Sequence, residues 1–146
     1  MSSQVSIRPL ARSQAEAVLE LWRQAEAIPT PTDTVEDINR LLAKEQAVFF
    51  VAELRGEIVG SIIATFDGWR GYIYRLAVHP DHRRQGIARL LVEAAEQTFL
   101  HWGVHRVTAL VNNEHGWATG FWTAAGYQQD AKTTRFVRQI KNDQRR

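Results

Sequence analysis

Apolar residues follow two different spacings along the first half of the chain. Up to about residue 42 they recur every three or four positions, which predicts two amphipathic helices. From residue 48 to 78 the pattern changes to β-branched and aromatic runs separated by short turns, which predicts antiparallel strands. A short alternating run at Val5, Ile7 and Leu10 predicts an earlier strand. The expected helices cover about 13–26 and 34–42, and the strands 48–54, 58–66 and 72–78.

The second half of the chain alternates helices and strands. The longest helix is expected over 86–102, with a broad apolar face and Gly103 as its stop. Alternating apolar residues over 107–111 predict a strand, and a helix follows that Asn112 and Asn113 can cap and Gly126 ends. Two last strands are expected near 127–132 and 135–140, before a frayed polar tail over 141–146. Because a strand, a helix and the next strand normally pair in parallel, residues 72–111 predict one parallel unit.

Short polar signals mark the starts of helices and the tips of hairpins. Ser13 followed by Glu16 matches a capping box, and Thr34 with Asp37 resembles another helix cap. The polar turn 67–71 carries Trp69 at its tip. This side chain can contact a substrate, contact a second copy of the chain in a homodimer, or fold onto the hairpin, and the sequence leaves all three open.

Composition narrows the classes of function. A chain of 146 residues that is 45% hydrophobic predicts one domain over 1–146. The net charge of +2 without a basic stripe argues against nucleic acid, and no apolar run is long enough for a membrane span, so a cytoplasmic protein is expected. The chain has no cysteine, which excludes disulfides, thiolate metal sites and a thiol nucleophile. The histidine pairs 79/82 and 101/105 lack a third ligand, so no metal is predicted.

The junction between the strand 72–78 and the helix 86–102 is the segment most suited to chemistry. A helix start presents free backbone amides to an anion, and Gly86 permits a close approach because it has no side chain. Arg83 and Arg84 add positive charge. We name residues 83–88 the anion cradle, with a diphosphate as the ligand that suits it. In the alternative, Gly86 merely begins a helix and both arginines are solvated.

At these residues the sequence resembles the GNAT superfamily of acetyl-CoA-dependent N-acetyltransferases. The pattern Arg83-x-x-Gly86-x-Ala88 matches the pyrophosphate motif of that family, and a strand of the family's type precedes it, ending Leu76-Ala77-Val78. A later segment, Ala118-x-x-Phe121-Trp122-x-x-x-Gly126-Tyr127, matches in register. The resemblance implies an α/β single domain with a mixed, mostly antiparallel sheet of six to seven strands, helices on both faces and a splayed pair of parallel strands.

The resemblance also implies a cosubstrate, acetyl-CoA, without a metal. A bulge in the fourth strand would splay it from the fifth, and pantetheine would lie in the gap against backbone groups of Leu76 and Val78. An amide freed there would polarise the thioester carbonyl, which makes Leu76 a catalytic candidate through its backbone. The residues expected to hold acetyl-CoA are Leu76, Ala77, Val78, Arg83, Arg84, Gln85, Gly86, Ile87, Ala88, His115 and Trp122.

Proton transfer is where the sequence departs from the family. The tyrosine that commonly protonates the CoA thiolate would fall at Trp122, whose indole donates a hydrogen bond but is no acid near neutral pH. His115, Tyr74 and water remain as candidates. His115 stands where relatives carry an asparagine with a binding role. Alternation places Tyr74 on the side of Leu76 and Val78, and simple packing is its alternative role.

The resulting hypothesis is an N-acetyltransferase that moves an acetyl group from acetyl-CoA to a primary amine of a small molecule or of a protein N-terminus. Without a cysteine, direct attack in a ternary complex is expected. The family layout places the acceptor among residues 27–33, the splayed strand and the last hairpin. The alternative is a non-catalytic acyl-CoA-binding or interaction module on the same fold. The acyl group, acetyl or longer, stays open.

Overall fold

A computed structural model describes residues 4–112 and 116–140 of the chain. The chain divides into two compact units, Met1–Val111 and Asn112–Arg146, and each is described here by itself. The first unit contains the whole sheet and the α-helices that pack on it. Among the described residues, no helix combines the length and the apolar character needed to cross a bilayer.

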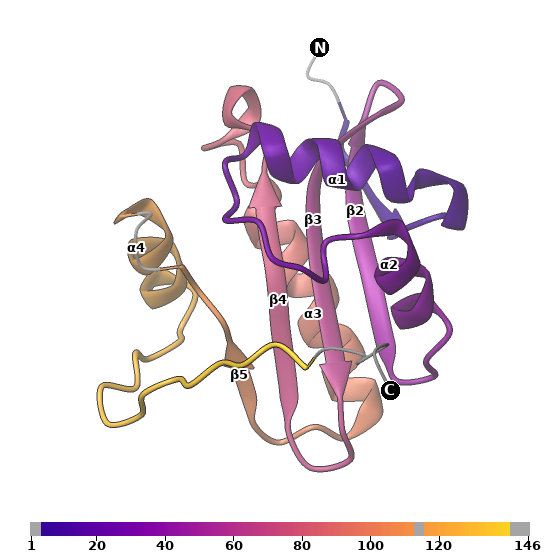
Figure 1. Ribbon diagram of the computed structural model, residues 1–146. Helices are drawn as coiled ribbons and strands as arrows, with labels where there is room; N and C mark the ends of the chain where they lie inside the picture. The colour runs from indigo at the N-terminus through magenta and orange to yellow at the C-terminus, as the bar shows by residue number, and fades with distance from the viewer. Residues whose placement is uncertain (1–3, 113–115, 141–146) are drawn as a thin grey trace, which may run out of the picture. The chain divides into compact units, whose positions relative to one another are not determined.

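The first unit is built on a five-stranded mixed sheet (Figure 1). Strands lie in chain order, and all neighbours are antiparallel except β4 and β5, which are parallel. The parallel pair confirms the strand–helix–strand unit predicted for residues 72–111. The strands are β1 (Ser6–Pro9), β2 (Ala47–Leu54), β3 (Glu57–Phe66), β4 (Gly71–Val78) and β5 (Val107–Ala109).

Helices cover both faces of this sheet. In Figure 1, α1 and α2 lie in front of the sheet and α3, the crossover between β4 and β5, lies behind it. A fourth helix, α4, belongs to the second unit. The helices are α1 (Ala15–Gln24), α2 (Val35–Leu42), α3 (Ile87–Trp102) and α4 (Gly116–Ala124), with short 3₁₀ helices η1 (Arg12–Gln14) and η2 (Pro80–His82).

Two of the predicted local signals are confirmed and one is wrong. The Thr34 hydroxyl accepts a hydrogen bond from the Asp37 amide at 3.0 Å and caps α2. Arg55 and Gly56, both with positive φ, form the two-residue turn between β2 and β3. Ser13 caps nothing, because it lies inside η1, and the Gln14 side chain instead accepts from the Ala11 amide at 3.0 Å. The capping box expected at Ser13 and Glu16 is therefore absent.

The sheet is buried on both faces by different helices. On one face, Phe49, Val51 and Ile63 pack against apolar residues of α1 and α2, and Phe49 stacks on Trp22 with ring centroids 5.9 Å apart. On the other face, α3 buries the apolar stripe that its sequence predicted. The buried residues of α3 are Ile87, Leu91, Val92, Ala95 and Phe99.

The sheet has fewer strands than expected. The two last strands predicted near 127–132 and 135–140 do not form in the described part of the chain. Residues 128–140 are all exposed, including Phe136 at 92%. A strand normally gains stability by burying one apolar face, and this largely polar segment buries none, so the six to seven strands of the expectation are corrected to five.

Gly71 allows α3 to approach β4 closely. We therefore expect a larger side chain at this position to destabilise the protein. A Cβ at this position would lie 2.7 Å from the Phe99 ring. Because Phe99 is itself buried, the ring has little room to move, and Gly71→Ala should lower the free energy of unfolding by about 1–3 kcal/mol. Urea denaturation followed by circular dichroism measures this. Gly120→Ala is the control, since its Cβ meets nothing within 4 Å and alanine favours the helix, so equal losses in both variants would contradict the close approach.

Candidate active site

The central feature of the first unit is a β-bulge in β4. Ser61 pairs with Ala77 and Ile63 pairs with Tyr74, so two residues, Arg75 and Leu76, lie opposite Ile62 alone. Arg75 has a φ of 54°, in the left-handed region that residues with a side chain rarely adopt. The bulge is therefore a local distortion that neighbouring groups must stabilise.

A buried hydrogen-bond chain from α1 stabilises the bulge. The Trp22 indole N–H donates to the Ser61 hydroxyl at 2.9 Å, and this hydroxyl donates to the Arg75 carbonyl at 2.8 Å. Ser61 is completely buried. Its hydroxyl thus uses both its donor and its acceptor capacity, and the carbonyl of the strained residue is fixed from one side.

Beyond the bulge, β4 has an open edge. Among the described residues, strand pairing with β5 covers Gly71 to Ile73, and the Leu110 amide donates to the Ile73 carbonyl at 3.0 Å. The His79 amide donates to the Val59 carbonyl of β3, so the backbone groups of Val78, by alternation, point to the opposite edge. In the described residues no strand pairs with this edge over 74–78. The parallel pair therefore separates after three residues, as the resemblance implied.

The bulge also corrects the expected facing of Tyr74. The extra residue reverses the alternation, so Tyr74 and Ala77 share the face covered by α1 and α2. Val78 pairs with Gly60, and a Cβ added at Gly60 would contact Leu91 and Ile87 of α3. Val78 therefore lies on the face that α3 covers. Tyr74 and Val78 thus lie on opposite faces of the sheet. Tyr74 is half-buried, packs against the core and stacks on Tyr72 with ring centroids 6.3 Å apart.

The anion cradle follows directly after β4 and η2. Arg84 and Gly86 both have positive φ, 65° and 83°, and Gly86 is the N-terminal cap of α3. No side chain caps this helix and its first turn holds no acidic residue. Free first-turn amides and the partial positive charge of a 16-residue helix therefore face outward beside exposed Arg84. These groups fit an anion such as a diphosphate.

Within the cradle the side chains differ in role. Ile87 is buried in the core, so only its amide is available to a ligand, whereas Arg84 and Gln85 are exposed. The Arg83 guanidinium donates to the Val78 carbonyl at 3.2 Å and to the Ala25 carbonyl at 3.4 Å. Arg83 thus links the end of β4 to the segment after α1.

Residues 15–127 match the Acetyltransferase (GNAT) family. The chain belongs to this family. This GNAT acetyltransferase is 34% identical over 124 residues to an acetyltransferase of Pectobacterium atrosepticum, covering 85% of the chain and 88% of the relative. An acetyltransferase of Sodalis glossinidius is 30% identical over 140 residues, covering 96% of the chain and 99% of the relative.

A solved structure shows the same fold as the GNAT acetyltransferase described here. It is an aminoglycoside N-acetyltransferase, AAC(6′)-Iy, in complex with CoA. The TM-score is 0.76 and the sequence identity 18%, and the match covers 98% of each chain. The likeness confirms the GNAT-like α/β fold expected from the sequence.

The second unit of the GNAT acetyltransferase contains Trp122. Its ring is buried and meets Tyr127 edge-on, with centroids 4.8 Å apart, while the Tyr127 amide donates to the Trp122 carbonyl. Gly126, with a φ of 98°, makes the turn between them. His115, the other candidate of this segment, and the predicted cap Asn113 lie outside the described residues. The role expected for Trp122 stays a prediction.

The remaining candidates lie apart from β4 and the cradle or serve the local fold. Trp69 is 72% exposed, and the Arg70 guanidinium of the same turn lies 4.0 Å from its ring centroid. In the same turn, amides of Arg70 and Trp69 donate to Asp67 and lower the pKa of its carboxyl. The imidazole of His79 accepts from the Asp81 amide at 3.1 Å.

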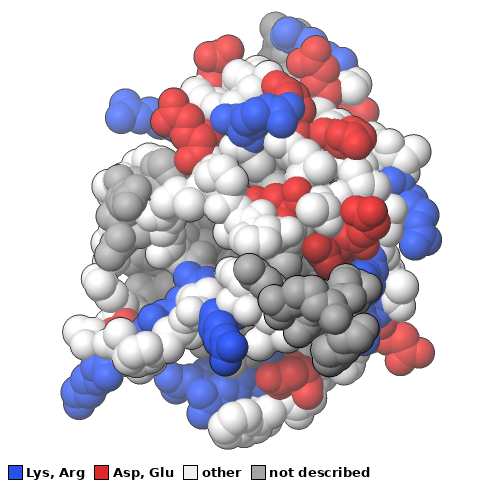
Figure 2. Space-filling model, viewed as in Figure 1, with Lys and Arg blue, Asp and Glu red and all other residues white. Residues whose placement is uncertain are grey.

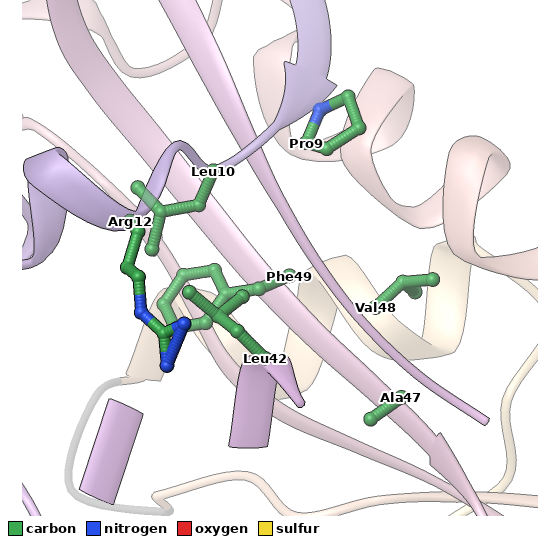
Figure 3. A pocket seen from close by; sticks show the side chains of 7 residues that line it. All are labelled: Pro9, Leu10, Arg12, Leu42, Ala47, Val48 and Phe49. Atoms are coloured by element: carbon green, nitrogen blue, oxygen red, sulfur yellow. The ribbon is translucent and has the colours of Figure 1, made fainter. Parts of the chain in front are cut away.

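A pocket of about 300 Å³ lies at the far edge of the sheet, between β1, β2 and α2 (Figure 3). Its lining is apolar apart from Arg12. Two strands, β2 and β3, separate β1 from β4, so this pocket is distinct from the bulge and the cradle. The lining residues are Pro9, Leu10, Arg12, Leu42, Ala47, Val48 and Phe49.

Sequence reasoning missed one residue of this region, Arg75. A charged residue inside the apolar strand Tyr-Ile-Tyr-Arg-Leu-Ala-Val was the available signal, because inward charges in strands are rare without a partner. Its partners come from the segment between α1 and α2, more than 40 positions away in the chain.

Proposed function

We propose that this protein transfers an acetyl group from acetyl-CoA to a primary amine by direct attack in a ternary complex. The observation that carries the proposal is the open edge of β4, bulged at Arg75 and Leu76, directly before the uncapped N-terminus of α3. The open edge of β4 offers backbone groups to an extended ligand, and the N-terminus of α3 offers amides to an anion. CoA has both an extended pantetheine arm and a diphosphate, and the structural relative AAC(6′)-Iy was solved with CoA.

The backbone of the cradle would hold the pyrophosphate. Amides from Arg84 to Ala88 lie at the start of α3, where the helix dipole favours negative charge. Leu76 and Val78 would bind the pantetheine arm through their backbone groups at the open edge, with Ala77 between them. These contacts use main-chain atoms, so they place no demand on the side chain of Gln85, and the side chain of Ile87 is constrained by the core alone.

The Leu76 amide is the proposed donor to the thioester carbonyl oxygen. As the amine nitrogen attacks the carbonyl carbon, that oxygen gains negative charge, and a fixed N–H stabilises it without reorganisation. The new bond is N–C, the C–S bond breaks, and the sulfur leaves with the electron pair. The nitrogen loses one proton and the sulfur gains one, giving an amide and free CoA.

The route of these protons is assigned to a small set of groups. Since the chain has no cysteine, no acyl-enzyme on a thiol forms, and the amine must attack in its neutral form. Trp122 cannot protonate the departing sulfur, because an indole N–H is not acidic near neutral pH. His115, Tyr74 and water are the proposed proton carriers, with Tyr74 also packing against the core.

Charge around α1 and α2 favours a cationic small-molecule acceptor. Between Ala15 and Leu42 the chain carries acidic Glu16, Glu20, Glu26, Asp33, Glu36 and Asp37 against basic Arg23 and Arg40. On the face seen in Figure 2, acidic side chains gather over these helices. Such a field attracts polyamines and amino sugars. The solved relative AAC(6′)-Iy is an aminoglycoside acetyltransferase, which supports the same class.

The test is an acetylation assay with a mixed panel of acceptors. The protein is incubated with acetyl-CoA and aminoglycosides, polyamines, simple primary amines and peptides with free N-termini, while thiol release and product mass are followed. Acetylated product with matching thiol release supports the transferase. Calorimetric CoA binding without turnover across the panel would favour the non-catalytic acyl-CoA-binding module.

A further inference from the structure

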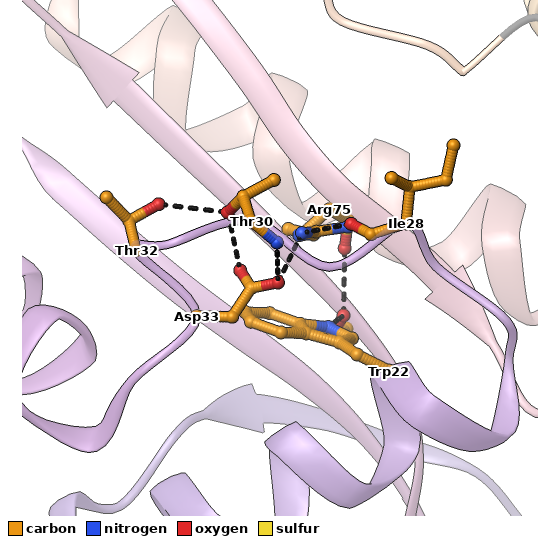
Figure 4. Close-up of polar contacts among 7 residues, drawn as sticks. Trp22, Ile28, Thr30, Thr32, Asp33 and Arg75 are labelled. Carbon is orange, nitrogen blue, oxygen red and sulfur yellow. Dashed lines mark hydrogen bonds and ion pairs between the residues drawn. The ribbon is translucent and has the colours of Figure 1, made fainter. Parts of the chain in front are cut away.

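Arg75 takes part in two structures at once. Its backbone forms the β4 bulge, and its side chain reaches the α1–α2 loop, which we define as residues 25–34 (Figure 4). The guanidinium donates to the Ile28 carbonyl at 2.9 Å and to the Asp33 carboxylate at 2.6 Å. Both charged side chains are about four-fifths buried, at 20% and 19% exposure. The electrostatic attraction within such an ion pair is stronger than in an exposed pair, because less water screens it.

The partner Asp33 organises the loop. Its carboxylate accepts from the Thr30 amide at 3.0 Å and from the Thr30 hydroxyl at 3.2 Å. The same carboxylate therefore closes the 30–33 turn and receives Arg75. Because these hydrogen bonds share one carboxylate, loss of Arg75 would also weaken the turn.

Trp22 connects the two halves of the arrangement. The Arg75 guanidinium lies 5.0 Å from the Trp22 ring centroid, within the range of a cation–π contact. The indole N–H of the same tryptophan begins the hydrogen-bond chain through Ser61 to the Arg75 carbonyl. The backbone and the side chain of Arg75 are thus held by one packed unit.

We propose that Arg75 is a positioning residue that sets the α1–α2 loop against the β4 bulge and so places the acceptor amine at the Leu76 amide. The proposal rests on the proposed function, because it assigns the acceptor to this loop. The side chain of Arg75 donates to Ile28 and Asp33 and lies over Trp22, all in α1 or the α1–α2 loop and none in the anion cradle. Arg83 independently ties the end of β4 to Ala25, so the cradle keeps its own anchor when Arg75 is lost.

Replacement of Arg75 should therefore separate acceptor binding from CoA binding. In Arg75→Met the acceptor KM rises about tenfold or more, while the Kd for CoA stays within about twofold. Arg75→Lys restores part of the loss, because an ammonium can pair with Asp33 but lacks the planar guanidinium that lies 5.0 Å from the Trp22 ring centroid. Asp33→Asn raises the acceptor KM as well, and the double variant is no worse than Arg75→Met alone.

Arg8→Met is the matched control. Arg8 pairs with Glu53 at 2.5 Å, and the two side chains are 30% and 27% exposed, but this pair lies between β1 and β2. The control loses a similar ion pair without touching the loop, so its acceptor KM stays that of the parent. A rise in acceptor KM in Arg8→Met equal to that in Arg75→Met, or an unchanged KM in Arg75→Met, would overturn the positioning role.

A second readout needs no activity. Hydrogen exchange of the amides over 28–33 and the NMR signal of the Trp22 indole N–H are measured on the free protein. Both should change in Arg75→Met and neither in Arg8→Met, and unchanged exchange over 28–33 would overturn the proposal. If the parent protein acetylates no amine in the panel, the proposed function is wrong. If only the positioning role of Arg75 is wrong, the parent protein still acetylates an amine and Arg75→Met does so with an unchanged acceptor KM.

Discussion

Gly86→Glu is expected to weaken CoA binding about a hundredfold or more, which is the largest effect on a single ligand that the structure predicts. A Cβ at Gly86 meets nothing within 4 Å, so the new side chain fits the folded protein and extends into the space in front of the α3 amides. There its carboxylate takes the place proposed for the diphosphate and repels it. Isothermal titration calorimetry with CoA measures the loss.

Gly68→Glu is the control for this variant. Gly68 also has a positive φ, 94°, and its Cβ also meets nothing within 4 Å, but it lies in the exposed turn between β3 and β4. Both variants force glutamate into the left-handed region and should lose about 1 kcal/mol of stability. Only Gly86→Glu should lose CoA affinity. Equal affinities in the two variants would place the diphosphate away from the cradle.

Removal of one backbone N–H, that of Leu76, is expected to lower kcat about a hundredfold to a thousandfold. No side-chain substitution tests an amide, and proline is unsuitable because Arg75 before it has a positive φ. Incorporation of the α-hydroxy acid analogue of leucine replaces the N–H by an ester oxygen and leaves the side chain in place. Single-turnover acetylation with the best amine of the panel then measures the chemical step.

The same replacement at Leu10 provides the comparison. The Leu10 amide donates to the Phe49 carbonyl at 2.8 Å, near β1 at the other side of the sheet. An ester there loses a structural hydrogen bond and about 1 kcal/mol of stability, without lowering kcat. If the two esters change kcat equally, the Leu76 amide is not the donor to the carbonyl oxygen.

The elements that the sequence predicted correctly are those with strong local causes. The apolar stripe of α3 and the glycines at its two ends fixed the longest helix, because both Gly86 and Gly103 adopt the positive φ that glycine tolerates. The Thr34 cap involves residues three positions apart, so it could be inferred without knowledge of the rest of the fold. The helix start beside the cradle was predicted for the same reason, while the ligand of the cradle stays a prediction.

The bulge was expected only from the family resemblance and not from the residues of the strand, because its cause is not local. Residues 72–78 form an apolar run interrupted by Arg75, and this pattern does not show that Arg75 leaves the extended conformation. The groups that hold it, the Ser61 hydroxyl and the Trp22 indole, come from β3 and α1. One inserted residue then reverses the facing of everything after it, which is why Tyr74 and Val78 were expected on one face and lie on two.

Two other predictions were wrong, the capping box at Ser13 and the last two strands. Ser13 matched a capping pattern, but the chain leaves β1 through a 3₁₀ turn in which the Gln14 side chain satisfies the Ala11 amide. The two last strands were expected near 127–132 and 135–140, but residues 128–140 are exposed, and a strand forms only where its backbone and one face find partners. The first error shows one local hydrogen bond in place of another, and the second shows a segment that buries no face.

The order of the strands also bears on how the protein folds. From β2 to β5 each strand pairs with its neighbour in the chain, and the crossover helix α3 packs on strands that precede it. The β2–β3 and β3–β4 hairpins close short loops and form quickly. β1 also pairs with the next strand of the chain, but Ser6 pairs with Glu53 and both helices α1 and α2 lie between them. During synthesis from the N-terminus, β1 therefore emerges first but must wait for β2, and we expect it to join the sheet only after the chain has passed residue 53.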